Sequence, residues 1–502
     1  MKKIRILSFF ILLCLLFSSA APAALALDAP EVTAQSWIIV DLNTGKVIDE
    51  FNADEQRSPA SLTKIMTGLL SVEAAESGAV SMDSTVRAGL DCQTGLDSSS
   101  SNASIVAGEE MSFRDYFYCA MVVSANEACN VLGSHIAGSI GGFVDLMNRR
   151  AEELGLVNTH FSDPNGLSSE NRTTARELSL ILQEALQHED FLAAFTTTAY
   201  TVPKTNYNEQ RELKTTDALT THDSYYSQYG DYYYEYALGG KTGFTRAAGY
   251  CLASVAEKDD LRVLIVVMGC PGPLTQDSTE PENFKDSIRL YNWVFEHFSY
   301  HEVLSSSEVI RKEPVEQAEG DGTVSLRCTG DLTLLLPDDV LPESRTLDVS
   351  LYEDRLKAPI PAGTVLGRLT LSIGGETYGP FDLVNVAEVK MSKIEYIQEQ
   401  VDGFFAARAV RVVIVVLALI LVLYFALVLR YRALRRKHLR EKKRAEKRRK
   451  AAREARRLRS ESAVKEPTLR FTSLDPGERD ADTIDLARFF DEPKEKENST
   501  ET

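Results

Sequence analysis

Hydrophobic and polar residues change their spacing several times along this 502-residue chain. Alternating positions near the start predict two strands, at residues 36–40 and 46–50, joined by the turn Leu42-Asn43-Thr44-Gly45. Helical spacing then fills most of residues 61–195, including residues 143–154 and 175–186. The pattern therefore predicts a β-hairpin that leads into a mainly helical region.

Continuous apolar runs return after the helical region. Residues 250–255 and 261–268 predict two strands across the turn at residues 257–260. Helical spacing follows at residues 286–298, around Trp293. With the first hairpin, these elements predict a sheet covered by helices, an α/β (α+β) domain over residues 27–300.

A second pattern begins at about residue 304. Short strands are predicted at residues 332–336, 347–351 and 365–371, and turns are predicted at Pro361-Ala362-Gly363 and Gly374-Gly375. These elements indicate a separate small all-β domain over residues 304–395. Nothing in its sequence has a pattern typical of a catalytic or metal site.

Two long apolar runs lie outside these domains. Residues 6–17 follow a basic start and precede Ala24-Leu25-Ala26, so residues 1–26 are predicted to be a secretory signal peptide cleaved before Leu27. An uncleaved anchor is the alternative, although a 12-residue run is short for a membrane span. Residues 412–429 contain no charge and are long enough to span a membrane, and residues 396–411 are the predicted linker before them.

Charge is divided unevenly along the chain. Residues 430–459 contain 17 Lys or Arg against three Glu, which places residues 430–502 in the cytoplasm by the positive-inside rule. A nucleic-acid patch is the alternative, but a position directly behind a predicted span favours membrane topology, in which the basic run could also contact anionic lipid headgroups. Residues 27–429 carry 29 basic and 58 acidic side chains, a net charge of −29, and of these, residues 27 to about 405 are predicted to lie outside the cell. This portion does not suit binding to nucleic acid or other anionic polymers by charge alone.

The remaining segment, residues 460–502, is acidic and poor in apolar residues, so it is predicted to be a disordered tail. Phe489-Phe490 within it could dock on a cytoplasmic partner, or the whole segment could be a tether.

The cysteines show no pairing pattern. Cys14 lies in the predicted signal peptide, and the other six show no close pairing or metal-ligand spacing. We therefore predict buried free thiols and expect no metal or cofactor site. The six are Cys92, Cys119, Cys129, Cys251, Cys270 and Cys328.

Three short motifs carry the candidate chemistry: Ser61-Leu62-Thr63-Lys64, Ser124-Ala125-Asn126 and Lys241-Thr242-Gly243. In the first, Ser61 and Lys64 would share one face of a helix, which pairs a nucleophile with a candidate base. Apolar residues with helical spacing follow, so Ser61 is predicted to open a buried helix. The positive end of that helix would lower the proton affinity of Lys64.

Each motif alone is a weak signal, because Ser-x-x-Lys and Ser-x-Asn occur by chance and Lys-Thr-Gly is common in surface turns. Their order, their separations of 63 and 117 residues and their settings together favour one serine-nucleophile site.

In this order the motifs resemble those of the penicillin-recognising serine enzymes, and in particular the low-molecular-mass D-alanyl-D-alanine carboxypeptidases of peptidase family S11. The resemblance covers roughly residues 30–395. It includes residues 38–47, 58–67, 160–167, and 240–245 running into 248–253. It implies a β-lactamase/transpeptidase-like catalytic domain, an all-β stalk domain, a peptidoglycan stem-peptide substrate and inhibition by β-lactams.

The family resemblance also implies a role for each motif residue. Ser61 would attack the carbonyl between the two terminal D-alanines, Lys64 would take its proton, and Ser124 would relay a proton to the leaving amine. The implied substrate-binding residues are Asn126, Lys241, Thr242 and Gly243, and the implied oxyanion hole consists of the backbone N–H groups of Ser61 and Phe244. Strand alternation sends Lys241 and Thr242 to opposite sides, so their convergence on one substrate is implied only by the family.

Two features depart from the family pattern. Related enzymes often have an arginine just before the closing helix, but Asn283 falls there, with Lys285 the nearest cation. This puts substrate affinity or selectivity in doubt. Residues 225–236 contain seven tyrosines, which either stack on substrate at the rim of the site or pack a loop.

Three other functions remain as alternatives. A β-lactamase is disfavoured by the β domain and the membrane span, and no deacylating Glu is recognisable. A noncatalytic sensor of wall fragments or β-lactams is suggested by the long tail, and it would stay acylated and release no D-alanine. A cross-linking transpeptidase is disfavoured because only 35 residues separate the expected cleavage site from Ser61.

Overall fold

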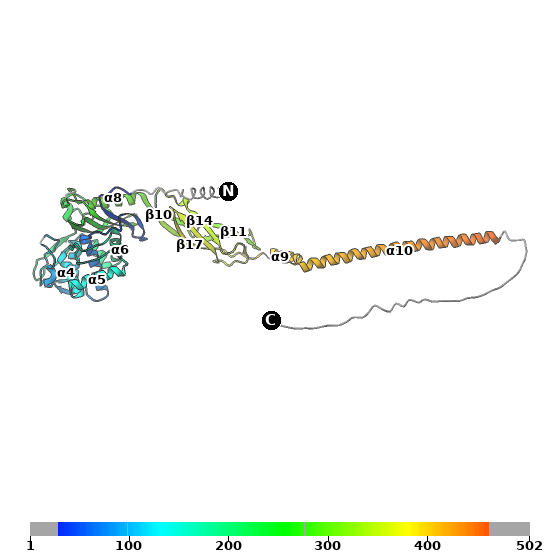
Figure 1. Ribbon diagram of the computed structural model, residues 1–502, viewed down its shortest axis with the longest axis horizontal. Coiled ribbons are helices and arrows are strands. Elements are labelled where there is room, and N and C mark those ends of the chain that lie inside the picture. The colour runs from blue at the N-terminus through cyan, green and yellow to red at the C-terminus, as the bar shows by residue number, and fades with distance from the viewer. Residues whose placement is uncertain (1–28, 98, 276–277, 461–502) are drawn as a thin grey trace, which may run out of the picture. The chain divides into compact units, whose positions relative to one another are not determined.

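The computed structural model describes residues 29–97, 99–275 and 278–460, which form two compact units divided between Glu395 and Tyr396 (Figure 1). The predicted signal peptide and acidic tail lie outside the described residues. The first unit contains a mixed helical and sheet region followed by an all-β region. The predicted domain boundaries at residues 300 and 304 stay predictions.

The centre of the first unit is an antiparallel sheet with the strand order β2-β1-β9-β8-β7. Its strands are β1 (Ser36–Asp41), β2 (Val47–Phe51), β7 (Ala237–Thr245), β8 (Gly249–Lys258) and β9 (Leu261–Cys270). The predicted hairpin and the two predicted strands at residues 250–268 are therefore confirmed. β7, which carries the Lys-Thr-Gly motif, lies at one edge of this sheet.

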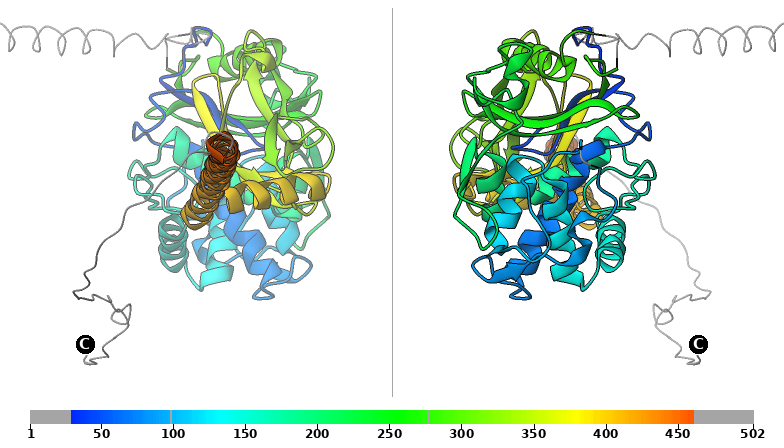
Figure 2. Two further views of the ribbon diagram at one scale, coloured as in Figure 1. Left: turned by 90° about the vertical axis from the view of Figure 1, so that its right-hand side faces the viewer. Right: turned by 90° about the vertical axis from the view of Figure 1, so that its left-hand side faces the viewer.

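Helices cover both faces of the sheet because its strands are apolar on both sides. Residues such as Ile39, Leu252 and Ile265 pack with α8 (Glu282–His297) on one face. On the other face, Ile38 and Val266 join the larger core of the remaining helices. Figures 1 and 2 show α8, in green, on one side of the sheet and the blue and cyan helices on the other.

Those remaining helices are α2 (Lys64–Glu76), α3 (Phe113–Val122), α4 (Asn126–Ala137), α5 (Ile140–Glu153), α6 (Ala175–Ala185) and α7 (Glu189–Phe195). The structure also contains short two-stranded pairs that the hydrophobic pattern did not predict: β3 (Thr85–Arg87) with β4 (Glu110–Ser112), and β5 (Ala199–Val202) with β6 (Arg211–Lys214). These strands have only three or four residues, too few for a clear period.

Two predicted helix starts are corrected. Ser61 does not open an α-helix: it lies in a short 3₁₀ turn, η1 (Ala60–Thr63), and α2 begins at Lys64. Ala60 has a φ of +50° in this turn, a conformation that interrupts a regular helix. The closing helix α8 begins at Glu282, four residues earlier than predicted, directly after Pro281.

The all-β region contains a six-stranded sheet in the order β14-β16-β17-β12-β11-β15 and the pair β10-β13. Its strands are β10 (Phe298–Leu304), β11 (Arg311–Glu316), β12 (Thr323–Cys328), β13 (Leu332–Pro337), β14 (Thr346–Leu351), β15 (Leu356–Lys357), β16 (Val365–Ile373) and β17 (Glu376–Asn385). Tyr300 at its start donates a 2.7 Å hydrogen bond to Asp41 of β1. The three predicted strands in this region are confirmed as β13, β14 and β16.

The second unit is helical and begins at Tyr396, within α9. α9 (Lys393–Ala406) leads into α10 (Arg408–Ser460). α10 is the one helix among the described residues that is long and apolar enough to cross a membrane, with a mean hydropathy of 3.5 over 18 residues. The uncharged run at residues 412–429 lies in its first half, and the basic run continues as helix behind it.

Candidate active site

The first motif places Ser61 and Lys64 together at the start of α2. Lys64 is fully buried, and its Nζ donates hydrogen bonds to Ser61 Oγ at 2.9 Å, Asn126 Oδ1 at 2.7 Å and the backbone oxygen of Asn165 at 2.6 Å. A neutral Lys64 amine would instead accept from the Ser61 hydroxyl along the same 2.9 Å line. The pair therefore has the geometry of a nucleophile and its base.

The second motif lies in the turn between α3 and α4. Ser124 has a φ of +61°, an uncommon conformation for a residue other than Gly, and its Oγ accepts a 2.9 Å hydrogen bond from Lys241 Nζ. Asn126 begins α4, and its Nδ2 donates to the backbone oxygen of Ser101 at 2.9 Å. This second bond fixes the amide so that its oxygen faces Lys64.

The third motif lies on the edge strand β7. Lys241 and Thr242 are buried and, as strand alternation requires, make different contacts: Lys241 Nζ donates to Ser124 Oγ, and Thr242 Oγ1 donates to Thr216 Oγ1 at 2.6 Å. A Cβ at Gly243 would lie 3.0 Å from the oxygen of Pro59 and 3.2 Å from the nitrogen of Leu62. Gly243 therefore lets β7 pack closely against the turn that carries Ser61.

A loop for which the sequence predicted no role completes the surroundings of Lys64. Asp163 accepts hydrogen bonds from the backbone nitrogens of Asn165, Gly166 and Ser168, which folds the loop so that the Asn165 oxygen meets Lys64. Gly166 has a φ of +93°, and a Cβ there would lie 1.9 Å from the oxygen of Ala60. The sequence signal was present, because Asp163-Pro164-Asn165-Gly166 is typical of a tight turn.

Burial changes the proton affinity of both lysines. Removal from water lowers the pKa of Lys64 below its usual value, and it lowers the pKa of Lys241 further, with the charge of Lys64 as the next cause. Each lysine also interacts electrostatically with a buried carboxyl group: Glu127 with Lys64, and Asp217 with Lys241. The sequence motifs included neither carboxyl group.

These carboxyl groups are held in similar ways. Glu127 Oε1 accepts from the backbone nitrogens of Ala103 and Ile105, and Asp217 Oδ1 accepts from that of Leu219. The second oxygen of each, Oε2 and Oδ2, is buried and has no hydrogen-bond partner among the described residues. Burial raises the pKa of Glu127 and raises that of Asp217 to about 6.

Asn283 and Lys285 stand at or near the position where related enzymes have an arginine, and the structure shows what each of them contacts. Asn283 is buried in α8, where its Nδ2 donates to the backbone oxygen of Cys251 at 3.3 Å. Lys285 pairs with Glu280 at 2.7 Å and Glu282 at 3.6 Å. Neither residue is therefore placed as a counterpart of the family arginine.

The tyrosine-rich segment mainly packs its own loop. Tyr232 stacks on Phe284 and Tyr234 on Tyr291, so both rings pack on α8. Tyr225 and Tyr233 are the exposed large aromatic residues of this segment, with exposed fractions of 63% and 45%. The packing alternative is supported for the buried rings.

Each of the six cysteines in the described range is buried and unpaired, as predicted. The thiol nearest in sequence to the site motifs is Cys129 on α4, and burial raises its pKa to about 11, so it stays protonated at neutral pH.

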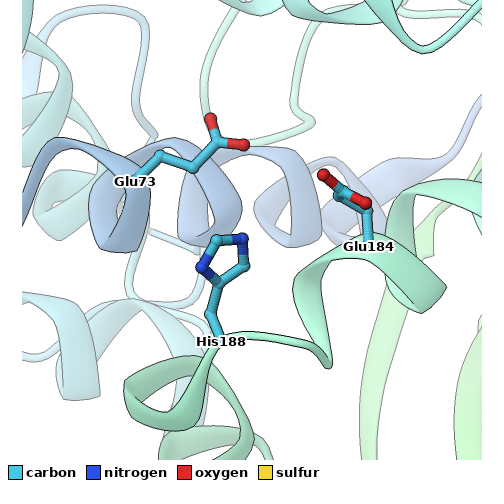
Figure 3. A group of neighbouring side chains, drawn as sticks. All are labelled: Glu73, Glu184 and His188. Carbon is cyan, nitrogen blue, oxygen red and sulfur yellow. The ribbon is translucent and has the colours of Figure 1, made fainter. Parts of the chain in front are cut away.

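Three ligand-type side chains that belong to none of the motifs, Glu73, Glu184 and His188, lie close together (Figure 3). The Arg150 guanidinium already pairs with Glu73 at 2.7 Å and with Glu184 at 2.6 Å. His188 Nδ1 lies 2.8 Å from the carboxylate of Glu76. Arg150 therefore pairs with two of the three side chains and joins α5 to α2 and α6.

Comparison with known proteins connects both regions of the first unit to one group of enzymes. A family model described as D-alanyl-D-alanine carboxypeptidase matches residues 23–272, and one described as the C-terminal domain of penicillin-binding protein 5 matches residues 298–391. A similar protein is D-alanyl-D-alanine carboxypeptidase DacF of Bacillus subtilis, 29% identical over 68% of this chain and 82% of the relative. Another is the D-alanyl-D-alanine endopeptidase of Escherichia coli, 31% identical over 59% of this chain and 89% of the relative.

Solved structures show the same fold. Penicillin-binding protein 5 from Haemophilus influenzae matches with a TM-score of 0.53 at 24% identity. The match covers 72% of this chain and 99% of the Haemophilus chain. DacD from Francisella tularensis has a TM-score of 0.56 at 22% identity, over 72% of this chain and 95% of its own. At these identities the likeness concerns the fold alone.

Proposed function

Because the chain belongs to the serine-type D-alanyl-D-alanine carboxypeptidases of family S11, we propose that it removes the terminal D-alanine from peptidoglycan stem pentapeptides and so limits cross-linking of the cell wall. The observation that carries this proposal is the fully buried Lys64 Nζ, 2.9 Å from Ser61 Oγ. Burial favours the neutral amine, which is the form that can take a proton.

Acylation is the first step. Ser61 Oγ attacks the carbonyl carbon between the two D-alanines as Lys64 takes its proton, and the backbone N–H groups of Ser61 and Phe244 stabilise the oxyanion. The bond to the terminal D-alanine then breaks, and its nitrogen receives a proton through Ser124, which accepts a hydrogen bond from Lys241. The products are free D-alanine and an ester between Ser61 and the shortened peptide.

Substrate binding uses the other motif residues. Lys241 and Thr242 face the terminal carboxylate, Gly243 lets the peptide backbone approach β7, and Asn126 holds a substrate amide or Lys64. The close packing of β7 on the Ser61 turn supports this arrangement. A β-lactam carbonyl mimics the scissile amide, so β-lactams acylate Ser61 in the same way.

The second step separates this function from its alternatives. Water resolves the ester in a carboxypeptidase, whereas an amine resolves it in a transpeptidase, and a sensor leaves it in place. The family membership supports hydrolysis. The reaction as proposed needs no metal, so chelator has no effect on it.

The proposed location follows from the second unit. The apolar part of α10 anchors the chain in the cell membrane, with the catalytic domain outside and residues 430–502 in the cytoplasm. The uninterrupted helical run of basic residues behind the apolar run supports this orientation. The proposal includes a cytoplasmic partner that binds the tail.

The test uses the full-length protein in detergent with a synthetic stem pentapeptide and a fluorescent penicillin. We expect tetrapeptide and free D-alanine by mass spectrometry, and a label on the peptide that contains Ser61. Ser61→Ala should lose both, whereas Ser71→Ala, which removes one buried hydroxyl from the helix that follows, should keep both. Labelling without D-alanine release would favour the sensor, and dimeric product before tetrapeptide would favour the transpeptidase.

A further inference from the structure

The side chain of Thr216 lies directly beside the Lys-Thr-Gly strand. Thr242 Oγ1 donates to Thr216 Oγ1 at 2.6 Å, so the hydroxyl proton of Thr242 is already used within the protein. A hydroxyl group can donate one hydrogen bond and accept others, so Thr216 keeps its own proton for another acceptor. The structure shows no acceptor for that proton among the described residues.

Exposure distinguishes the two threonines. Thr242 is buried, with an exposed fraction of 4%, whereas Thr216 is half-buried. The free donor of this pair is therefore also the more accessible one. A carboxylate that approaches Thr242 meets the Thr216 hydroxyl beside it.

Backbone contacts fix the position of Thr216. Its nitrogen donates to the oxygen of Val122 at 3.2 Å, which joins it to the end of α3, two residues before Ser124. On either side, the nitrogen of Thr215 donates to the oxygen of Thr198 at 2.8 Å, and the Thr215 hydroxyl accepts from the nitrogen of Asp217 at 3.1 Å. Thr216 thus links the turn of the second motif to the strand of the third.

The residues at the position of the family arginine do not take over its role in binding the substrate carboxylate. The two residues at the position of the family arginine are engaged elsewhere, because Asn283 bonds to Cys251 and Lys285 pairs with two glutamates. Lys241 is buried, and its Nζ already donates to Ser124 Oγ and to the backbone oxygen of Thr242. A carboxylate has up to about four acceptor sites, so it needs further donors here.

We propose that the Thr216 hydroxyl donates a hydrogen bond to the terminal carboxylate of the substrate, in place of an arginine, while the hydrogen bond from Thr242 orients that hydroxyl. This inference rests on the proposed function, because it assumes that the carboxylate lies at the Lys-Thr-Gly strand. It assigns recognition of that group in this chain to the Thr216 hydroxyl, which Thr242 orients beside the buried Lys241.

The test measures how strongly acylation depends on a ligand carboxylate. Benzylpenicillin and its methyl ester are compared by intact-protein mass spectrometry with the full-length protein in detergent. Thr216→Val keeps the shape but removes the hydroxyl, so the acid-to-ester ratio of acylation rates should fall by roughly tenfold or more, the size expected for one hydrogen bond to a charged group. Thr216→Ser should restore most of the ratio.

The matched control is Thr220→Val. This variant removes a hydroxyl of the same segment, one that donates to the backbone oxygen of Asp217. Its acid-to-ester ratio should equal that of the natural protein. A natural ratio in Thr216→Val, or a Thr216→Ser variant as defective as Thr216→Val, would overturn the assignment of Thr216. If neither ligand acylates the natural protein, the proposed function itself fails, and this inference fails with it.

Discussion

At the scale of single residues, four buried ionisable groups lie at the candidate site. Lys64 and Lys241 lose proton affinity through burial, and the neighbouring Glu127 and Asp217 gain it. These opposite shifts bring the lysines and the carboxyl groups closer to their neutral forms. A neutral lysine is a base, whereas a neutral carboxyl group no longer stabilises lysine charge.

The first prediction concerns Lys64. In the proposed mechanism the neutral amine of Lys64 is the base, so the acylation rate should rise with pH through the pKa of Lys64, and burial moves that rise below the ordinary lysine value of 10.5. Lys64→Ala should lower the rate by about a hundredfold or more. Rates of labelling by fluorescent penicillin from about pH 6 to about pH 10 provide the measurement, with the exposed Lys46→Ala as control. A flat profile in the natural protein would contradict the assignment.

The second prediction concerns Asp217. Its pKa is raised from 3.8 to about 6, so its stabilising contribution is complete below pH 3.8 and is lost as the pH rises through about 6. Asp217→Asn keeps an oxygen for the nitrogen of Leu219 and removes the charge. The variant should therefore gain stability relative to the natural protein between about pH 4 and about pH 8, by up to about 3 kcal/mol. Thermal unfolding at several pH values measures this, and parallel curves would refute it.

Packing between elements sets the geometry of the site. The loop at residues 163–168 and the edge strand β7 both press against the η1 turn, and in each case a glycine makes the approach possible. At Gly166 the contact is with the oxygen of Ala60, and at Gly243 it is with the oxygen of Pro59. The position of Ser61 therefore depends on two elements distant in sequence.

The third prediction tests this dependence with two glycines of similar conformation. Gly166 and Gly138 have φ values of +93° and +77°, but a Cβ at Gly138 would meet nothing within 4 Å. Gly138→Ala should cost only the backbone strain, about 1 kcal/mol in the free energy of unfolding. Gly166→Ala adds a clash with backbone, so it should cost more and should slow penicillin acylation. Denaturant unfolding and labelling rates compare the two, and equal effects would argue against the packing role.

At the scale of the whole molecule, charge and hydropathy divide the chain. The 403 residues from 27 to 429 carry a net charge of −29, whereas residues 430–459 carry +14. The border between the two lies at the end of the apolar run in α10. This distribution is the basis of the proposed topology.

The fourth prediction follows from that topology. Protease added to intact, wall-stripped cells should remove residues 27–405 and spare a tag placed at Thr502. A chain that ends at Glu395, before the second unit, should be released from the membrane fraction. Digestion of the Thr502 tag with the membrane intact would reverse the proposed orientation.

The sequence by itself determined the features that depend on local pattern. The β1–β2 hairpin, the strands β8 and β9, three strands of the β domain and the long apolar helix all follow from the spacing of apolar residues and turn residues. Motif order and resemblance likewise selected the residues that meet at the site, although their roles remain proposals. The 3₁₀ turn η1 could not be predicted in this way, because the positive φ of Ala60 has no signature in periodicity.

Only the tertiary structure decided which groups meet. Lys64 bonds to Asn165 across 101 positions of sequence, and Thr242 bonds to Thr216 across 26. Such contacts depend on the close packing of whole elements, and local spacing does not encode that packing. The same reason explains why Glu127 and Asp217 were missed: a carboxyl group acquires its chemistry here from burial beside a lysine, which exists only in the folded chain.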